Sequence, residues 1–296
     1  MTDKFFKAYY VWPHFPSVSM SGNACFLHCK HCNHTYLRDM QNLSNPEDFY
    51  HLVSQLPRQG AVGFLLSGGC NKKGEMLNLR DFLPKIKQIK QETDLVVKLH
   101  TGIVDRTLAE EIVAAGVDIA SVEVVGSDDT IQAIFGFDAS VDSYTSTLIN
   151  LEQAGMPYIV PHICIGLHYG QQLGEWKALE LIKEHCDPSL LVFIVFRPTK
   201  GTEMQACMTP SPDLVSTIIT KAKEIFPNKD LSLGCIRPRV HLRQEIESAA
   251  LKAGVTRMEI PSKTTLTLAA QMGYTIKKVH ACCALPEALE KKALVC

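Results

Sequence analysis

The sequence predicts an α/β fold in which parallel strands alternate with helices: a (β/α)8 TIM-type barrel, full or nearly full, with a cysteine-bearing C-terminal tail. Eight short apolar runs have the length of strands, and stretches with helical spacing separate them. Such alternation requires right-handed crossovers, which favour a barrel, with an open doubly wound sheet as the alternative. The expected strands cover residues 17–20, 62–66, 95–100, 119–125, 158–165, 191–196, 231–236 and 257–260.

The helices between these strands have recognisable ends. The first begins at Asn45-Pro46-Glu47, which offers a capping residue and then proline at the first helical position. Four later stretches end at a glycine just before a strand, where a left-handed backbone costs glycine little: Gly60, Gly116, Gly155 and Gly254. No linker or low-complexity segment interrupts the pattern. We therefore expect one domain over residues 1–296, with a tail from about 275–296 that covers the barrel mouth.

The composition excludes several classes of partner. The chain is 46% hydrophobic, enough for a sizeable core, and its 30 basic and 31 acidic residues give a formal charge of −1. No strong field would draw in nucleic acid or an anionic membrane. The apolar runs are too short to span a membrane, and the first seven residues lack the apolar core of a signal peptide. We expect a cytoplasmic protein.

Cysteine usage points to metal rather than to disulfides. The chain has eleven cysteines, an odd number, and several of them are clustered. Without an export signal, reduced thiols that bind metal are the better interpretation, which implies an oxygen-sensitive protein.

Cys25, Cys29 and Cys32 form a C-x3-C-x2-C motif directly after the first expected strand. Three thiolates leave one metal position of a cluster open, whereas a closed structural site needs four ligands. The motif resembles that of the radical S-adenosylmethionine (SAM) superfamily. This resemblance implies a [4Fe-4S] cluster whose free iron chelates the amino and carboxylate groups of SAM. A zinc site that also uses His28, His31 and His34 is the alternative.

The second expected strand ends in Ser67-Gly68-Gly69-Cys70. Two glycines at a strand end let the backbone approach a ligand closely. In radical SAM enzymes a glycine-glycine-glutamate motif stands here and contacts the amino group of SAM, but this chain has Cys70 in place of the glutamate. On the fourth strand, Glu123 faces the barrel interior by alternation, and we expect it to hydrogen-bond the ribose or amino group of SAM.

Further segments resemble the biotin-synthase-like branch of this superfamily. The stretch from His162 to Gly166 is similar to the one that packs against adenine there. Arg239, in Arg237-Pro238-Arg239, matches the place of the arginine that touches the auxiliary cluster of biotin synthase; a surface or phosphate-binding arginine is the alternative. A lone histidine near a strand end, such as His100, is more often structural than catalytic.

Four other cysteines predict a second site. Cys70 and Cys235 end strands two and seven, which open on the same barrel mouth, and a tail that folds across this mouth would bring Cys282 and Cys283 to them. We expect these thiols to hold an auxiliary [4Fe-4S] cluster that faces the first. Alternatively, Cys282-Cys283 is an ordinary vicinal pair and Cys70 fills a corner.

The other cysteines carry no expected ligand role. Cys164 lies in an apolar strand, where a free cysteine packs as a small hydrophobe. Cys186 and Cys207 are interpreted as incidental. Cys296, as the last residue of the chain, is not favoured as a ligand.

Nearly the whole chain resembles a divergent, biotin-synthase-related group. The resemblance rests on Ser-Gly-Gly-Cys after strand two, His100-Thr101-Gly102, Pro161-His162, Leu-Gly-Cys before Arg-Pro-Arg, and the Cys-Cys pair. Members are implicated in a two-protein lipoyl synthase, whose two radical SAM subunits share the sulfur insertions at C6 and C8 of a protein-bound octanoyl chain. Biotin synthase and the usual lipoyl synthase place their second cysteine site differently.

This resemblance implies a radical SAM sulfurtransferase with Cys70 and Arg239 in catalytic positions. It also implies a second radical SAM subunit, an octanoylated lipoyl-carrier protein as substrate, and an electron donor such as ferredoxin or flavodoxin. Two other hypotheses stay open: a radical SAM rearrangement or methylation without sulfur transfer, and a non-catalytic iron-sulfur or zinc-binding protein.

Overall fold

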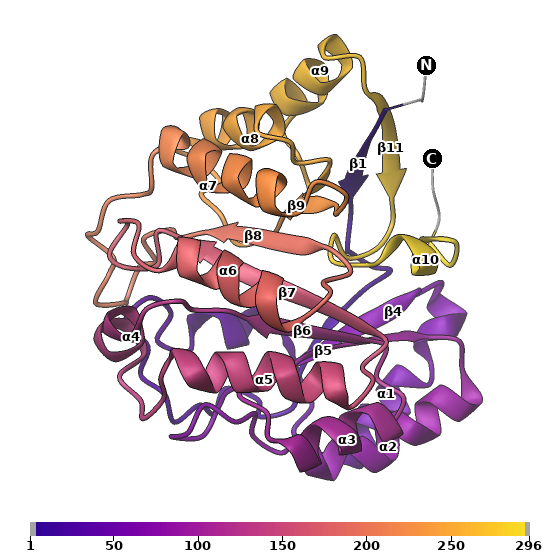
Figure 1. The fold of residues 1–296 in the computed structure, drawn as a ribbon. Helices are drawn as coiled ribbons and strands as arrows, with labels where there is room; N and C mark the ends of the chain where they lie inside the picture. The colour runs from indigo at the N-terminus through magenta and orange to yellow at the C-terminus, as the bar shows by residue number, and fades with distance from the viewer. Residues whose placement is uncertain (1–3, 294–296) are drawn as a thin grey trace.

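A curled, entirely parallel sheet forms the centre of the computed structural model, which describes residues 4–293 (Figure 1). Its eleven strands follow the order β11-β1-β10-β9-β8-β7-β6-β5-β4-β2-β3. The strands are β1 (Phe5–Tyr9), β2 (Ser17–Ser19), β3 (Gln41–Asn42), β4 (Gly63–Ser67), β5 (Val96–His100), β6 (Ile119–Glu123), β7 (Tyr158–Ile165), β8 (Leu191–Val195), β9 (Leu231–Leu233), β10 (Arg257–Glu259) and β11 (Thr275–Val279).

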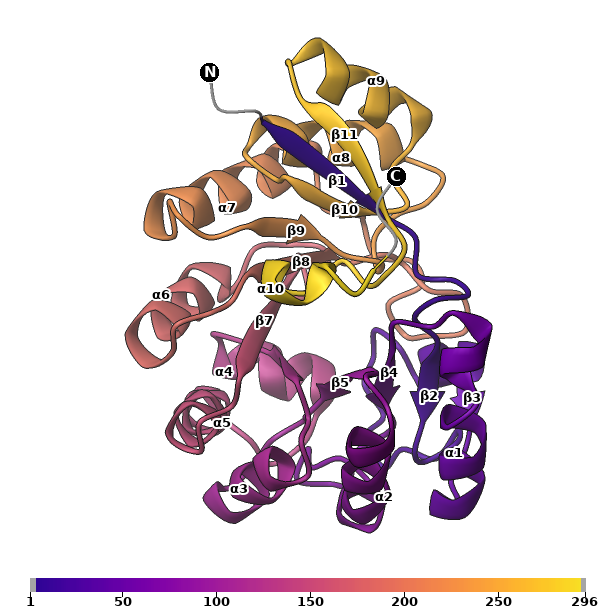
Figure 2. The same ribbon diagram turned by 90° about the vertical axis from the view of Figure 1, so that its right-hand side faces the viewer.

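Helices cover the outer face of this sheet, except for the short α10, which lies in the C-terminal segment (Figures 1 and 2). They are α1 (Pro46–Val53), α2 (Leu79–Glu92), α3 (Arg106–Ala114), α4 (Asp128–Thr130), α5 (Val141–Gln153), α6 (Glu175–His185), α7 (Pro212–Ile225), α8 (Arg243–Lys252), α9 (Lys263–Gln271) and α10 (Glu287–Glu290). Asn45 caps α1 as expected, since its side chain accepts from the Glu47 and Asp48 amides. The alternation of strands and helices is therefore confirmed as an α/β fold with a parallel sheet.

The curled sheet remains open, which corrects the expectation of a full barrel. Within residues 4–293 no hydrogen-bonded pairing joins the two edge strands, β3 and β11. Figure 2 views the molecule from the side on which these two edges lie apart. The doubly wound alternative fails as well, because the main core packs the outward side chains of the strands against one layer of helices.

The sequence pattern did not predict three of the strands. β1 precedes the first expected strand and pairs with both β10 and β11. β3 has only two residues, and β11 is an edge strand in which Val279 is the one buried residue, so neither shows a buried apolar run. The expected tail from residue 275 thus begins as a strand of the sheet.

The chain after β11 lies at the amino ends of the strands, not across their carboxyl ends. Cys283 and Leu285 belong to a buried cluster with Val62, Val96 and Ile119, which stand at or just before the first residues of β4, β5 and β6. The Lys292 ammonium donates to the Asp94 carbonyl, just before β5, over 2.8 Å. This segment fits there because its apolar side chains cover the strand starts that an open curl leaves exposed.

Segment 10–16 runs beside this C-terminal segment. The rings of His14 and His280 meet edge to face with their centroids 5.2 Å apart. The Val62 amide donates to the His14 carbonyl over 2.8 Å, which continues the contact to the start of β4. The two segments therefore connect both sides of the opening near the amino ends.

The described helices include none with the length and apolar character that a membrane crossing needs.

Candidate metal centre

The C-x3-C-x2-C motif lies in a loop that follows β2 and is fixed by backbone hydrogen bonds. The Cys32 and Asn33 amides both donate to the Cys29 carbonyl, at 3.2 and 2.9 Å, and the Lys30 amide donates to the Ile134 carbonyl at 2.9 Å. These bonds wrap the loop around Cys29, whose side chain is buried, while Cys25 and Cys32 are half-buried. The thiols therefore have a defined direction before any metal binds.

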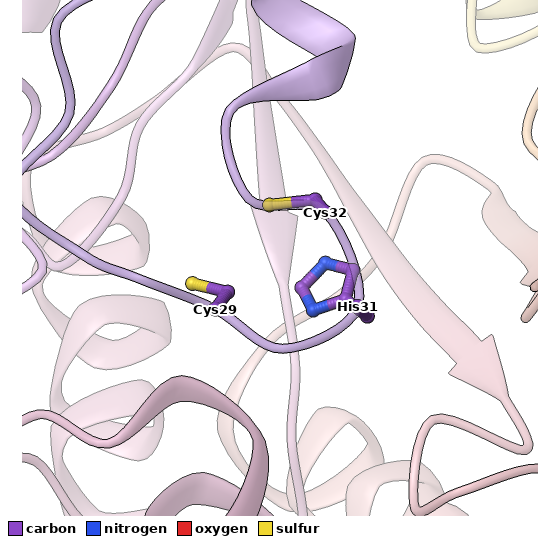
Figure 3. Close-up of side chains that lie close together, drawn as sticks. All are labelled: Cys29, His31 and Cys32. Atoms are coloured by element: carbon purple, nitrogen blue, oxygen red, sulfur yellow. The ribbon is translucent and has the colours of Figure 1, made fainter. Parts of the chain in front are cut away.

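Cys29, His31 and Cys32 place their ligand atoms within 4.8 Å of one another. In the close-up the two sulfur atoms lie on the same side of the loop, with the His31 imidazole beside them (Figure 3). The buried Nδ1 of His31 has no hydrogen-bond partner among the described residues. The donor set suits iron or zinc, and the unpartnered nitrogen is free to bind a metal or a polar group.

The electrostatics of the loop reflect thiols packed against each other. A hydrogen bond from Cys29 lowers the pKa of Cys32 to about 4, and His31 acts in the same direction. The same contact, together with burial, raises the pKa of Cys29. Burial alone would lower the pKa of His31. The neighbouring Cys32 and Glu123 outweigh burial, and together they raise this pKa. A cation at this point would relieve the repulsion among the sulfurs.

Gly69 allows the end of β4 to lie directly on the cysteine loop. A Cβ at this residue would lie 2.1 Å from the Ala24 carbonyl oxygen and 2.5 Å from the Cys25 Cβ, so no other residue fits. The Gly69 amide donates to the Ser21 hydroxyl over 2.7 Å, and the Cys70 amide donates to the Cys25 sulfur over 3.3 Å. The structure thus brings Cys70 to the first cysteine group, and burial raises the pKa of its thiol to about 12.

The other residues expected to bind SAM line the carboxyl half of the curl. Glu123, at the end of β6, makes no hydrogen bond within the described chain, and burial raises the pKa of its carboxyl group. The Ser67 hydroxyl lies 3.3 Å from the His100 Nδ1, and the His100 ring meets the His162 ring at 5.6 Å. Gly68 is half-buried beside the Ser21 hydroxyl.

Gly166 has a different environment from the one expected. Its amide donates to the Glu175 carboxylate over 2.8 Å, and a Cβ there would lie 2.2 Å from the Pro210 Cγ. Its backbone is left-handed at φ 74°, so the turn after β7 requires glycine for packing.

A second set of thiols combines the exposed Cys235 with Cys282, which is half-buried, and Cys283, which is buried. Cys235 follows β9, and Cys282 and Cys283 come from the C-terminal segment; the charges of these thiols raise or lower one another's pKa values. The buried Lys98 of β5 donates to the Cys282 sulfur over 3.5 Å. A hydrogen bond from Cys283 and the Lys98 ammonium lower the pKa of Cys282 to about 5. Cys70 lies with the first group instead of this one.

Arg239 holds the Cys235 loop in place. Its guanidinium donates to the Cys235 carbonyl over 2.9 Å and to the Glu259 carboxylate over 2.5 Å. The fully buried Arg237 donates to the Gly234 carbonyl over 2.7 Å and pairs with Glu247 over 2.8 Å. Both arginines therefore act on the backbone that carries Cys235.

Comparison with known proteins decides the family. The sequence profile of the Radical SAM superfamily matches residues 20–184, from the residue after β2 through most of α6. The chain belongs to the radical SAM superfamily. Membership implies a [4Fe-4S] cluster and SAM, and the open cysteine loop with its unpartnered His31 nitrogen and Glu123 carboxyl group fits both.

Solved structures share the fold of this radical SAM chain at low sequence identity. HydG, the [FeFe]-hydrogenase maturase from Carboxydothermus hydrogenoformans, gives a TM-score of 0.65 at 13% identity over 92% of this chain and 67% of its own. A second HydG structure gives 0.64 at 11% identity; the match covers 86% of this chain and only 56% of that one. Methylornithine synthase (PylB) gives 0.62 at 15% identity over 97% of this chain and 86% of its own. No curated protein sequence matches significantly.

The sequence interpretation missed Lys98 as a site residue. Its signal was visible, since Lys98 is a single charged residue inside the apolar run 95–99 and alternation places it on the same face as His100.

Proposed function

We propose that this radical SAM protein inserts sulfur into an unactivated C–H bond, with Cys235, Cys282 and Cys283 holding an auxiliary iron-sulfur cluster. The observation that carries the proposal is that Cys235, an exposed residue after β9, lies near enough to the Cys282-Cys283 pair for their charges to interact, although they come from two separate segments. Cysteine thiolates are the usual ligands of iron-sulfur clusters, so this donor set suits a cluster.

The two cysteine groups differ in position in a way that supports this chemistry. The triplet follows β2 at the carboxyl ends of the strands, whereas Cys283 packs with the residues that begin β4 to β6. A substrate bound between the two cysteine groups would have the triplet on one side and the second group on the other. With SAM and both clusters bound, the site would supply a SAM-derived radical for hydrogen abstraction, sulfide as the sulfur donor and iron as the acceptor of the released electron.

The protein's own residues bind and enclose the ligands. Glu123 offers an unpartnered carboxyl group to a polar ligand near the triplet. His100 and His162 are uncharged, because burial lowers the pKa of His100 to about 3 and that of His162 well below its usual value. An uncharged wall of this kind accommodates an alkyl chain better than a charged one would.

The proposed substrate is a protein-bound octanoyl chain, as in lipoyl cofactor formation. Support comes from the resemblance of the Ser-Gly-Gly-Cys, His100-Thr101-Gly102 and Cys282-Cys283 segments to the two-protein lipoyl synthase group. A second radical SAM subunit, an octanoylated carrier protein and a ferredoxin or flavodoxin belong to the same proposal.

Anaerobic reconstitution tests the proposal. Wild-type protein should hold about eight irons, and Cys282→Ala and Cys235→Ala about four, while the variants still cleave SAM under dithionite. An octanoylated carrier peptide should gain sulfur when incubated with the wild-type protein, and should gain none with the Cys282→Ala or Cys235→Ala variant. Cys186→Ala, which changes a thiol near the end of α6, is the matched control.

Three results would contradict the proposal. About four irons in wild type would remove the auxiliary cluster. SAM consumption without sulfur gain would favour a rearrangement or methylation. Zinc in place of iron, bound by the close set Cys29, His31 and Cys32, would favour a non-catalytic metal site.

A further inference from the structure

Lys98 is an unusual side chain in the middle of a parallel sheet. It stands at the third position of β5, faces the inside of the curl and is only 3% exposed. Lysine is almost never buried to this degree without a carboxylate partner, because desolvation of an ammonium group is costly. No described carboxylate lies within ion-pair distance, and its hydrogen-bond partner is the Cys282 sulfur.

Within residues 4–293, the groups that surround Lys98 are thiols and uncharged histidines. Cys282 and Cys283 face it from the C-terminal segment, Cys235 from the end of β9, and two uncharged histidines, His100 and His162, from β5 and β7. Glu259, the nearby carboxylate that acts on Cys235, is already paired with Arg239. The positive charge of Lys98 is therefore directed at the thiols.

Two buried hydroxyl groups are a second feature of the inner face of the sheet. Ser121 of β6 and Ser232 of β9 are 2% and 0% exposed, and the Oγ atom of each lacks a hydrogen-bond partner within the described chain. Both lie in strands whose neighbouring positions, such as Ala120 and Leu233, face the helices, so the serines face inward. These hydroxyls leave hydrogen-bonding capacity on the inner face of the sheet that a polar group or a water molecule can use.

We propose that Lys98 is a positioning residue of the auxiliary cluster, whose ammonium group hydrogen-bonds the Cys282 thiolate and compensates the negative charge of the cluster. This inference rests on the proposed auxiliary cluster. A [4Fe-4S] core of charge +2 with three thiolates carries −1, and one ammonium group brings the site to neutrality. Net charge and hydrogen bonds to sulfur set the potential of such a cluster, so Lys98 raises it and makes the cluster easier to reduce.

The experiment measures the reduction potential of the auxiliary cluster by EPR-monitored titration. A full-length chain with Cys25, Cys29 and Cys32 replaced by alanine isolates that cluster, and Lys98→Met, Lys98→Arg and Lys87→Met are compared in this background. Lys98→Met should shift the potential to more negative values, because it removes a buried charge and a hydrogen-bond donor. Lys98→Arg should keep the potential close to the parent value, because it retains the positive charge. Lys87→Met, which removes an exposed lysine of α2, should leave the potential unchanged.

Each outcome decides the inference. Equal potentials in Lys98→Met and its parent overturn the role of Lys98 and leave the proposed function standing. Loss of the cluster in Lys98→Met with recovery in Lys98→Arg supports the role, whereas loss without recovery marks a merely structural residue and overturns it. Absence of any second cluster in the parent protein overturns the inference and the proposed function together.

Discussion

The two cysteine groups of this protein are built in opposite ways. Cys25, Cys29 and Cys32 lie within eight residues of one another, and hydrogen bonds within the loop or to β4 fix them. Cys235 and Cys282 come from segments that the whole of α8, β10, α9 and β11 separates. The first group is a local motif that lies within the match to the family profile, whereas the second exists only in the folded chain.

The largest expected effect comes from the local motif. Cys29→Ala removes the buried ligand, and we expect 5′-deoxyadenosine formation to fall about 100-fold or more, since the open cluster loses one of three thiolates. The iron attributable to the auxiliary cluster should remain. If Cys29→Ala loses both clusters, the two groups are not independent and the comparison fails.

The non-local group depends on a buried ion pair. Arg237→Met removes the fully buried partner of Glu247 and leaves this carboxylate with the partly exposed Arg243, so it should lower the free energy of unfolding by about 3 kcal/mol in urea titration. Iron in the auxiliary cluster should fall with it, because the Cys235 loop loses its anchor. Arg243→Met is the control: Arg243 is partly exposed and pairs with the same carboxylate, so a loss of about 0–1 kcal/mol is expected.

Gly69→Ala tests how tightly β4 lies on the cysteine loop. A Cβ would overlap the Ala24 carbonyl, and we expect a loss of about 1–3 kcal/mol in stability together with reduced binding of the first cluster. Gly68→Ala should be milder, since its nearest neighbour is the Ser21 hydroxyl at 3.1 Å. Comparable losses in both variants would show that the close contact is not required.

A smaller effect depends on pH. Burial would raise the pKa of Glu247, but Arg237, the Ser262 amide and Arg243 lower it to about 2, below the usual 4.5. Because the folded-state pKa is the lower one, the stabilisation is complete above pH 4.5 and is lost as the pH falls toward 2. Glu247→Gln should therefore flatten the decline in urea midpoint across this window. An unchanged slope would remove Glu247 as the cause.

The sequence allowed prediction of what short-range patterns determine. The strand-and-helix alternation, the cap at Asn45 and the cysteine loop were all visible, because each depends on neighbouring residues. The open curl was not, since closure depends on how edge strands such as β3 and β11 meet. Nor could the sequence show that Cys70 lies beside Cys25 while the C-terminal segment turns to the amino ends.

Cys283 packs against the starts of strands that precede it by up to some 220 residues in the chain, and this has a consequence for biogenesis. During translation the triplet and β4 leave the ribosome early and can fold together, since domains form from the amino end onward. The Cys282-Cys283 pair leaves it only after β11, and until then the ammonium group on β5 lacks its thiol neighbour. The triplet can therefore receive iron before the second cysteine group has formed.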